Sequence, residues 1–365
     1  MSVASLAPDY VRAIMAYQPG KPISELAREM GIAESDIVKL ASNENPLGMS
    51  PRAREAAIAA VSDVARYPDG GAFALKNALC STLGVEPEQL VVGNGSNDIL
   101  ELVSQAFLAP GLSAVYSRHA FAVYPLATNA RGARGIEVAA KNFGHDLDAM
   151  AAAIRPETRV VFVANPNNPT GTFLGGAELE AFLEGVPRHV LVVLDEAYTE
   201  YLAPEQRYDS IAWLARFPNL LVSRTFSKAY GLAGLRVGYG VTHPAVADLM
   251  NRVRQPFNVS SVGLAAAEAA LGDEEFIART AEVNRRGMTQ LTAAFGELGL
   301  EWIPSAGNFV TFKVGDAVGA NQALLRQGVI VRPIAAYGMP QWLRVSVGLA
   351  EENARFIAAL KQALA

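Results

Sequence analysis

The stretch Val190-Leu-Val-Val-Leu-Asp-Glu-Ala-Tyr198 decides the fold class of this sequence, because an apolar run ends there in a group of polar residues. Two more apolar runs end in the same way: residues 160–163 precede a turn at 165–171, and residues 220–222 precede the segment 224–228. Short β-branched runs with helical patterns between them are typical of buried parallel strands. We therefore predict an α/β fold whose mostly parallel sheet is flanked by helices.

The sequence pattern changes twice along the chain, which predicts three parts. Strand and helix signals alternate from about residue 40 to residue 271, with strands expected at 90–92, 114–116 and 236–241 besides the three runs above, as in a sheet with crossover helices. A long helix is then expected over 274–298, followed by strands at 308–313, 329–332 and 342–347 and a helix over 351–364. We expect an N-terminal arm (1–38) that packs on a partner or on the small domain, a large domain that holds the site (39–271), and a smaller α+β domain (272–365).

Composition and charge exclude several classes of function. The 365 residues are 51% hydrophobic and 18% charged, and a net charge of −5 without a basic run argues against nucleic acid as a partner. Asp9 and Arg12 interrupt any signal-peptide core, and no apolar stretch approaches membrane-spanning length, so we expect no membrane association and a cytoplasmic location. The single cysteine, Cys80, fits a reducing compartment, and the scattered histidines predict no metal site.

The polar residues after the strands predict a ligand site, since ligands of parallel sheets bind beyond the carboxyl ends of the strands. Lys228 follows a buried strand, where loss of solvent favours a neutral amine that forms an imine; alone it would be an ordinary surface lysine. Asp195 suits the nitrogen of a protonated pyridine ring, although a helix N-cap is the simpler alternative. Together these two side chains predict a pyridoxal phosphate site.

Three further side chains fit the same cofactor. The Asn168 amide and the Tyr198 hydroxyl are suited to hold a phenolic oxygen, while the run around Asn168 is also a plausible tight turn. Phe121 is suited to stack on the ring, and a core position is its alternative.

A second motif predicts a binding site for the cofactor phosphate. Gly93-Asn-Gly-Ser-Asn-Asp98 follows a strand and begins a helix, so its backbone N–H groups, including those of Gly95 and Ser96, are available to an anion; a plain turn is the alternative. Nucleotide-binding motifs are absent. Side chains that would join this phosphate site are Thr225, Ser227 and Arg236.

Two arginines interrupt the apolar β pattern of the smaller domain. Arg332 and Arg344 carry guanidinium groups that bind carboxylate or phosphate well, and outward-facing strand positions explain them equally.

These residues resemble the fold type I pyridoxal phosphate-dependent aminotransferases, and the similarity to the histidinol-phosphate aminotransferases runs nearly end to end. The motif around Lys228 with its downstream arginine is highly specific for the superfamily. The segments that carry the resemblance are 41–46, 66–69, 94–97, 167–171, 195–198, 225–236, 331–338 and 343–348.

The resemblance implies a role for each residue. Lys228 binds the cofactor as a Schiff base and moves the proton, Asp195 pairs with the ring nitrogen, and Tyr198 with Asn168 binds the phenolic oxygen. Phe121, where the family often has Tyr, stacks on the ring. The remaining roles are phosphate binding by Gly95, Ser96, Thr225, Ser227, Arg236 and the neighbouring subunit's Tyr67, and substrate binding by Asn45, Arg332 and Arg344.

The resemblance also implies a homodimer with shared active sites and a reaction. The expected reaction is transfer of an amino group between histidinol phosphate and 2-oxoglutarate, with glutamate as product, in histidine biosynthesis. Alternatives are an aromatic amino acid aminotransferase and a phosphoamino-acid decarboxylase of the same fold. A ligand-sensing regulator would need a DNA-binding module, for which the arm before residue 38 is too short and not basic enough.

Overall fold

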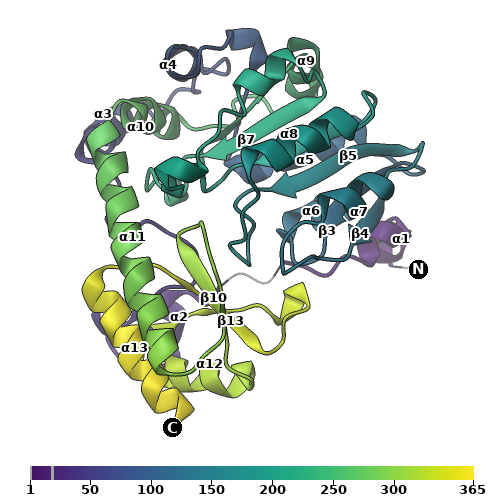
Figure 1. The fold of residues 1–365 in the computed structure, drawn as a ribbon. Coiled ribbons are helices and arrows are strands. Elements are labelled where there is room, and N and C mark those ends of the chain that lie inside the picture. The colour runs from purple at the N-terminus through teal and green to yellow at the C-terminus, as the bar shows by residue number, and fades with distance from the viewer. Residues whose placement is uncertain (1, 18–19) are drawn as a thin grey trace.

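The computed structural model describes residues 2–17 and 20–365, and Figure 1 shows an upper and a lower body connected along one side by the long helix α11 (Glu274–Glu297). The upper body contains a seven-stranded sheet, and the lower body contains a four-stranded sheet and a two-stranded one.

The seven-stranded sheet has the order β2-β8-β7-β6-β5-β3-β4. Strands β7, β6, β5, β3 and β4 run parallel to one another, while β8 is antiparallel to both β7 and β2. The predicted α/β fold with a mostly parallel sheet is confirmed. The strands are β2 (Leu90–Gly93), β3 (Ser113–Ser117), β4 (Arg134–Val138), β5 (Thr158–Ala164), β6 (Leu191–Asp195), β7 (Leu220–Thr225) and β8 (Gly238–Thr242).

Strand β4 is the one strand of this sheet that the sequence did not indicate. It lies at the edge of the sheet, and only Val138 of its five residues is buried, so it lacks the continuous apolar run of the inner strands. Central strands are covered on both faces: along β5, Val160 and Phe162 belong to one core cluster, and Val161 and Val163 belong to the other.

The helices of the upper body divide between these two cores. One core contains buried residues of α5 (Ser96–Phe107), α6 (Val123–Ala130) and α9 (Pro244–Val253). The opposite core contains buried residues of α3 (Pro51–Val61), α4 (Phe73–Leu83), α7 (Leu147–Ala152), α8 (Gly176–Gly185) and α10 (Ser261–Leu271). This three-layer arrangement leaves the carboxyl ends of the strands facing the lower body.

The lower body is built on an antiparallel sheet of order β12-β13-β10-β9. Its core includes Phe295 stacked on Phe312 with a centroid distance of 4.6 Å. The elements are β9 (Trp302–Ile303), β10 (Phe309–Lys313), β12 (Arg332–Pro333), β13 (Trp342–Ser346), α12 (Ala317–Arg326) and α13 (Ala350–Leu364).

The strand predicted over 329–332 is divided between two sheets. Strand β11 (Val329–Ile330) pairs in parallel with β1 (Val38–Lys39), whereas Arg332 pairs with Arg344 of β13. The chain therefore changes partner at Val331, which an apolar pattern alone does not reveal.

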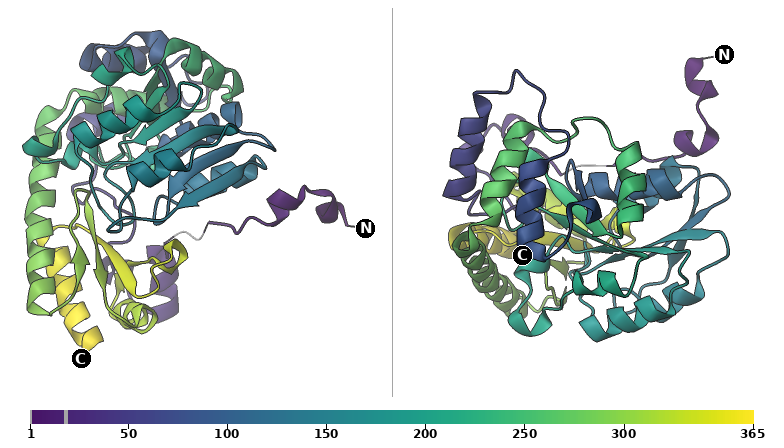
Figure 2. Two further views of the ribbon diagram at one scale, coloured as in Figure 1. Left: turned by 45° about the vertical axis from the view of Figure 1, so that its right-hand side comes forward. Right: turned by 90° about the horizontal axis from the view of Figure 1, so that it is seen from above.

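The N-terminal segment has two parts. Leu26 of α2 (Ile23–Met30) is buried in a cluster with Ile37, Leu325 and Ile330, so this helix packs on the lower body. Residues 2–16, with α1 (Asp9–Arg12), extend sideways from the molecule (Figure 2), whereas Tyr17 lies beside Arg332. The division of the chain at residues 38 and 271 stays a prediction.

Short 3-10 helices connect several of these elements. They are η1 (Val3–Leu6), η2 (Glu34–Asp36), η3 (Pro87–Gln89), η4 (Thr199–Tyr201), η5 (Pro204–Gln206), η6 (Ala212–Ala215), η7 (Ala233–Leu235) and η8 (Ala335–Tyr337).

Candidate active site

A cavity of about 200 Å³ lies at the carboxyl ends of β5, β6 and β7 and is closed on its other side by residues of the lower body. The structure brings most of the predicted site residues together in its wall. Those that line it are Ser96, Phe121, Asn168, Asp195, Tyr198, Thr225, Ser227, Lys228, Arg236, Arg332 and Arg344.

A larger hollow of about 950 Å³ lies elsewhere, lined mainly by residues 141–151, 171–185 and 302–306. It contains none of the predicted site residues. We place the site in the smaller cavity because that is where an amine, a carboxylate and guanidinium groups converge on one space.

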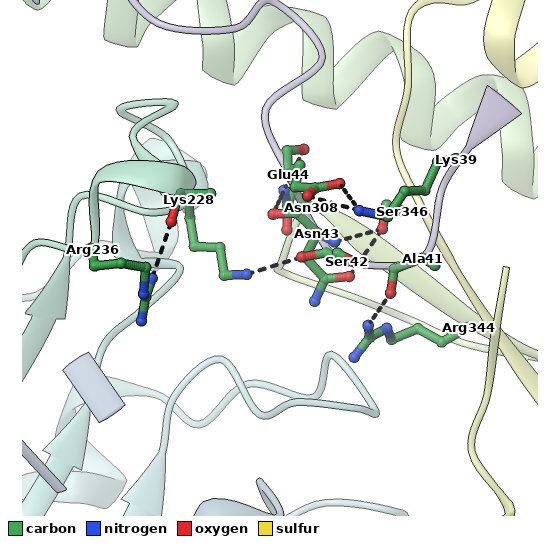
Figure 3. Close-up of polar contacts among 11 residues, drawn as sticks. Lys39, Ala41, Ser42, Asn43, Glu44, Lys228, Arg236, Asn308, Arg344 and Ser346 are labelled. Atoms are coloured by element: carbon green, nitrogen blue, oxygen red, sulfur yellow. Dashed lines mark hydrogen bonds and ion pairs between the residues drawn. The ribbon is translucent and has the colours of Figure 1, made fainter. Parts of the chain in front are cut away.

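Lys228 extends from the turn after β7 toward the segment 41–44 (Figure 3), and its Nζ donates a hydrogen bond to the Ser42 carbonyl oxygen at 3.1 Å. Burial lowers the pKa of this amine to about 8, and the nearby guanidinium of Arg344 acts in the same direction. A substantial fraction of the amine is therefore neutral near physiological pH, as imine formation requires.

Asp195 ends β6 with its two carboxylate oxygens in different situations. Oδ2 accepts a hydrogen bond from the Tyr124 hydroxyl at 2.9 Å, while Oδ1 is buried with no hydrogen-bond partner among the described residues. Burial raises the pKa of the carboxyl to about 6, against the lowering effect of the Tyr124 hydrogen bond. An unpaired buried acceptor beside a cavity fits a ligand that brings a proton donor, such as a pyridinium nitrogen.

Asn168 and Tyr198 are each held by another side chain. The Asn168 Oδ1 accepts from Arg344 Nη1 at 2.6 Å, which leaves the amide N–H groups as its remaining donors. The Tyr198 hydroxyl accepts from Asn43 Nδ2 at 2.9 Å and keeps its own proton to donate. Both groups are thus available as donors to an oxygen in the cavity.

The predicted phosphate site is assembled around Arg236. Its Nη1 donates to Ser227 Oγ at 3.0 Å, and its Nη2 lies 3.4 Å from the Asn94 carbonyl oxygen. Gly95 does not line the cavity but has φ +86, which other residues rarely adopt, and a Cβ there would clash with the Arg236 guanidinium in its present position. The first N–H groups of α5 begin directly after it, which suits an anion.

The two predicted substrate arginines lie side by side on β12 and β13. Arg344 is only 6% exposed, and its Nη2 donates to the Ala41 carbonyl oxygen at 2.7 Å. Arg332 is partly exposed, with its guanidinium 5.5 Å from the centre of the Tyr17 ring. One guanidinium is therefore a wall of the cavity, and the other lies nearer to its mouth.

Besides Gly95, two predicted residues do not reach the cavity. Asn45 is buried, and its Nδ2 donates to the Ala229 carbonyl oxygen at 2.8 Å and to Thr280 Oγ1 at 3.1 Å. Asn43, two residues earlier, lines the cavity instead. Tyr67 is 83% exposed and stacks on Phe257 with a centroid distance of 4.8 Å, so its expected contact with a neighbouring subunit's cofactor stays a prediction.

Sequence reasoning missed four residues that line or support the site: Tyr17, Asn43, Tyr124 and Tyr337. Asn43 belongs to the segment 41–46, which carries the family resemblance, but the resemblance implies substrate binding by Asn45, two residues later. Tyr124 lies in an apolar helical pattern, which gives no signal that its hydroxyl reaches Asp195.

Among residues 2–17 and 20–365, no group of three or more His, Cys, Asp or Glu side chains is arranged to hold a metal ion. In the same residues, no helix combines the length and apolarity needed to cross a bilayer.

The fold and the site define a pyridoxal phosphate-dependent aminotransferase, and the chain belongs to the family of class I and II aminotransferases, whose model matches residues 35–360. The chain is 65% identical over 362 residues to histidinol-phosphate aminotransferase 1 of Thiobacillus denitrificans, covering 99% of this chain and 94% of that one. It is 62% identical to histidinol-phosphate aminotransferase 1 of Dechloromonas aromatica, with full coverage of both.

Solved structures agree with this assignment. The histidinol-phosphate aminotransferase of Sinorhizobium meliloti, crystallised with pyridoxal 5′-phosphate, superposes with a TM-score of 0.89 at 29% identity, covering 98% of this chain and 96% of that one. A Thermus thermophilus aspartate aminotransferase mutant reaches 0.85 at 25% identity, covering 98% and 99%. The predicted fold type, enzyme class and cofactor are confirmed.

Proposed function

We propose that this aminotransferase moves the amino group of histidinol phosphate to 2-oxoglutarate, forming glutamate, as a step of histidine biosynthesis. Relatives at 59–65% identity over nearly the whole chain carry that enzyme's name. The observation that carries the proposal is the pair Arg332 and Arg344, which line the same cavity as Lys228. Two guanidinium groups suit the phosphate of one substrate and a carboxylate of the other.

Pyridoxal phosphate, when bound, supplies a cationic ring that accepts the electrons released at the substrate Cα. Asp195 would keep a proton on the ring nitrogen through its unpaired Oδ1. Asn168 and Tyr198 would donate to the phenolic oxygen, and Phe121 would lie against the ring face.

The phosphate of the cofactor would be held where donors converge around Arg236. Backbone N–H groups at the start of α5, together with Ser227, Thr225 and Arg236, form a set without a carboxylate. Gly95 contributes by leaving room for the guanidinium.

Lys228 is the proposed acid–base group of the reaction. Its Nζ would hold the cofactor at rest and, when released from it, would take the proton from the substrate Cα and deliver it to the cofactor. A pKa of about 8, lowered by burial, suits both directions of proton transfer near neutral pH. The buried Arg344 covers one side of the cavity and limits the access of water from that side.

We propose in addition that the enzyme is a homodimer in which Tyr67 completes the partner's phosphate site. Tyr67 and Phe257 are 83% and 46% exposed although they stack on each other, and large exposed aromatic groups favour an interface. The extended residues 2–17 expose Val3, Leu6 and Met15 in the same way. A cytoplasmic location is part of the proposal, since the chain has a single cysteine.

The test is kcat/KM for histidinol phosphate, phenylalanine and tyrosine, each with 2-oxoglutarate as acceptor. We expect histidinol phosphate to be preferred by about 10²-fold or more, because its phosphate, with more charge and more acceptor oxygens, would engage both guanidinium groups, whereas phenylalanine and tyrosine offer a single carboxylate. Preference for phenylalanine or tyrosine would contradict the assignment. Release of carbon dioxide from the donor without an acceptor would indicate a decarboxylase instead.

A further inference from the structure

Tyr124 is a residue that neither the family resemblance nor the proposed mechanism uses, yet it contacts the carboxylate on which the cofactor depends. Its side chain is completely buried in α6, and its hydroxyl donates to Asp195 Oδ2 at 2.9 Å. The other oxygen, Oδ1, has no partner within the described part of the chain. The backbone N–H of Ala197 also stabilises this carboxylate, and Oδ1 is the oxygen left without a partner.

We propose that Tyr124 is a positioning residue for the cofactor: its hydroxyl occupies Oδ2, fixes the plane of the Asp195 carboxylate, and leaves Oδ1 as the one acceptor offered to the pyridine nitrogen. A carboxylate has several acceptor positions, so binding one oxygen internally selects which oxygen faces the ligand. The inference rests on pyridoxal phosphate as cofactor and is independent of the amino donor.

The Tyr124 ring is itself held rigidly, which a positioning role requires. It is stacked on Phe162 of β5 with a centroid distance of 4.8 Å and an interplanar angle of 7°. Thr128 Oγ1 donates to the Tyr124 carbonyl oxygen at 2.7 Å, one turn further along α6. The hydroxyl therefore has little freedom to leave Asp195.

The same segment also orients the ring proposed to stack on the cofactor. Phe121 precedes Tyr124 by three residues and meets it edge to face, with centroids 6.0 Å apart and planes at 87°. The segment 121–124 would thus meet the cofactor in two ways, through the Phe121 ring and through the carboxylate that Tyr124 holds. We expect a substitution at Tyr124 to weaken mainly the interaction between Asp195 and the ring nitrogen of the cofactor.

Loss of the hydroxyl would act on Asp195 in a defined way. The carboxylate would keep its burial but lose a hydrogen bond that stabilises its charged form, so protonation becomes easier and its orientation less fixed. A protonated Asp195 no longer favours a proton on the ring nitrogen.

The experiment measures cofactor affinity of the cofactor-free protein, so no amino donor enters the result. Tyr124→Phe is compared with the unmodified protein for two probes: pyridoxal phosphate, and its analogue in which a C–H group replaces the ring nitrogen. Binding is followed by the absorbance of the bound cofactor. Tyr116→Phe is the matched control, because it removes a phenolic hydroxyl from the same core cluster without touching Asp195.

We expect Tyr124→Phe to weaken pyridoxal phosphate about tenfold, as for a hydrogen bond to a charged group, and to change affinity for the analogue less than about twofold. Tyr116→Phe should leave both affinities unchanged. Equal weakening of both probes would indicate a general packing role and overturn the proposal, and so would unchanged affinity for pyridoxal phosphate.

A double-variant cycle keeps the proposal testable if Tyr124→Phe also loosens the core. In the Asp195→Asn background, Tyr124→Phe should cause less than about a twofold further loss of pyridoxal phosphate affinity, since the contact it supports is already gone. A further tenfold loss in that background would show that Tyr124 acts independently of Asp195 and would refute its positioning role. Failure of the substrate assignment would leave this result unaffected.

Discussion

The cofactor side of the cavity and its mouth are built differently, although they face the same space. Asn168, Asp195 and Lys228 follow or end the neighbouring strands β5, β6 and β7, so one sheet fixes their relative positions. The opposite side, which includes the mouth, combines the wall residue Arg344 and the more exposed Arg332, both from the lower sheet, with segment 41–43 and Tyr17. The cofactor side therefore depends on one sheet, whereas the mouth depends on how separate segments pack together.

The two arginines test this difference with the largest expected effects. Arg344→Ala removes a buried donor from Asn168 Oδ1 and the Ala41 carbonyl oxygen, and we expect kcat/KM to fall by about 10²- to 10³-fold with weaker cofactor binding. Arg332→Ala, at a partly exposed position, should raise the KM for histidinol phosphate about tenfold and leave the affinity for pyridoxal phosphate unchanged. Steady-state kinetics and cofactor titration measure both.

An exposed pair supplies the control for these variants. Arg252 forms an ion pair with Asp248 at the surface of α9, and Arg252→Ala should change neither kcat/KM nor the affinity for pyridoxal phosphate. If Arg332→Ala weakened the cofactor as much as Arg344→Ala does, the distinction between wall and mouth would be wrong.

The sequence predicted that side chains at the ends of these strands meet at one cavity, for a physical reason, while their roles toward the cofactor stay predictions. Buried parallel strands have continuous apolar runs, and the residue that ends each run is placed at the same edge of the sheet, so Asp195 and Lys228 were found from pattern alone. Tyr124 was not, because a tyrosine in a buried helix has the same pattern whether or not its hydroxyl bonds a carboxylate.

The mouth was harder to predict because its geometry depends on long-range packing. Asn43 and Asn45 are two residues apart, yet Asn43 adopts φ +55 and reaches Tyr198, while Asn45 turns to Ala229. The two residues are identical in type and nearly adjacent, so the sequence does not show which of them faces the cavity. Tyr17 reaches Arg332 only because the arm passes beside the lower sheet.

The pH dependence of cofactor uptake tests the coupling between the two regions. In the cofactor-free protein, burial and then Arg344 lower the pKa of Lys228 to about 8, so the rate of pyridoxal phosphate uptake should rise with pH to a midpoint near 8. Arg344→Ala should move this midpoint upward, because a nearby positive charge is lost. Absorbance stopped-flow measures the rate, and a midpoint near that of a free lysine, about 10.4, would contradict the account.

The smallest expected effect concerns a buried acid behind the cofactor side. Burial raises the pKa of Glu200 to about 7, from 4.5 in the unfolded chain. The folded protein therefore binds this proton more tightly, and the stability gained in this way is complete below pH 4.5 and is lost as pH rises through about 7. Glu200→Gln should therefore flatten the pH dependence of thermal unfolding and stabilise the protein by about 1 kcal/mol above pH 7.

Differential scanning calorimetry between pH 5 and 8.5 follows this change, with the exposed Glu205→Gln as control. A steeper loss of stability in Glu200→Gln than in the unmodified protein would contradict the assigned direction of the pKa shift.

The most direct measurement is to reduce the holoenzyme with borohydride and locate the cofactor by peptide mass spectrometry. The account predicts one pyridoxyl phosphate group per chain, on the peptide that contains Lys228, and none in Lys228→Ala. Modification of another lysine, such as Lys39, or an unmodified Lys228 peptide would contradict it.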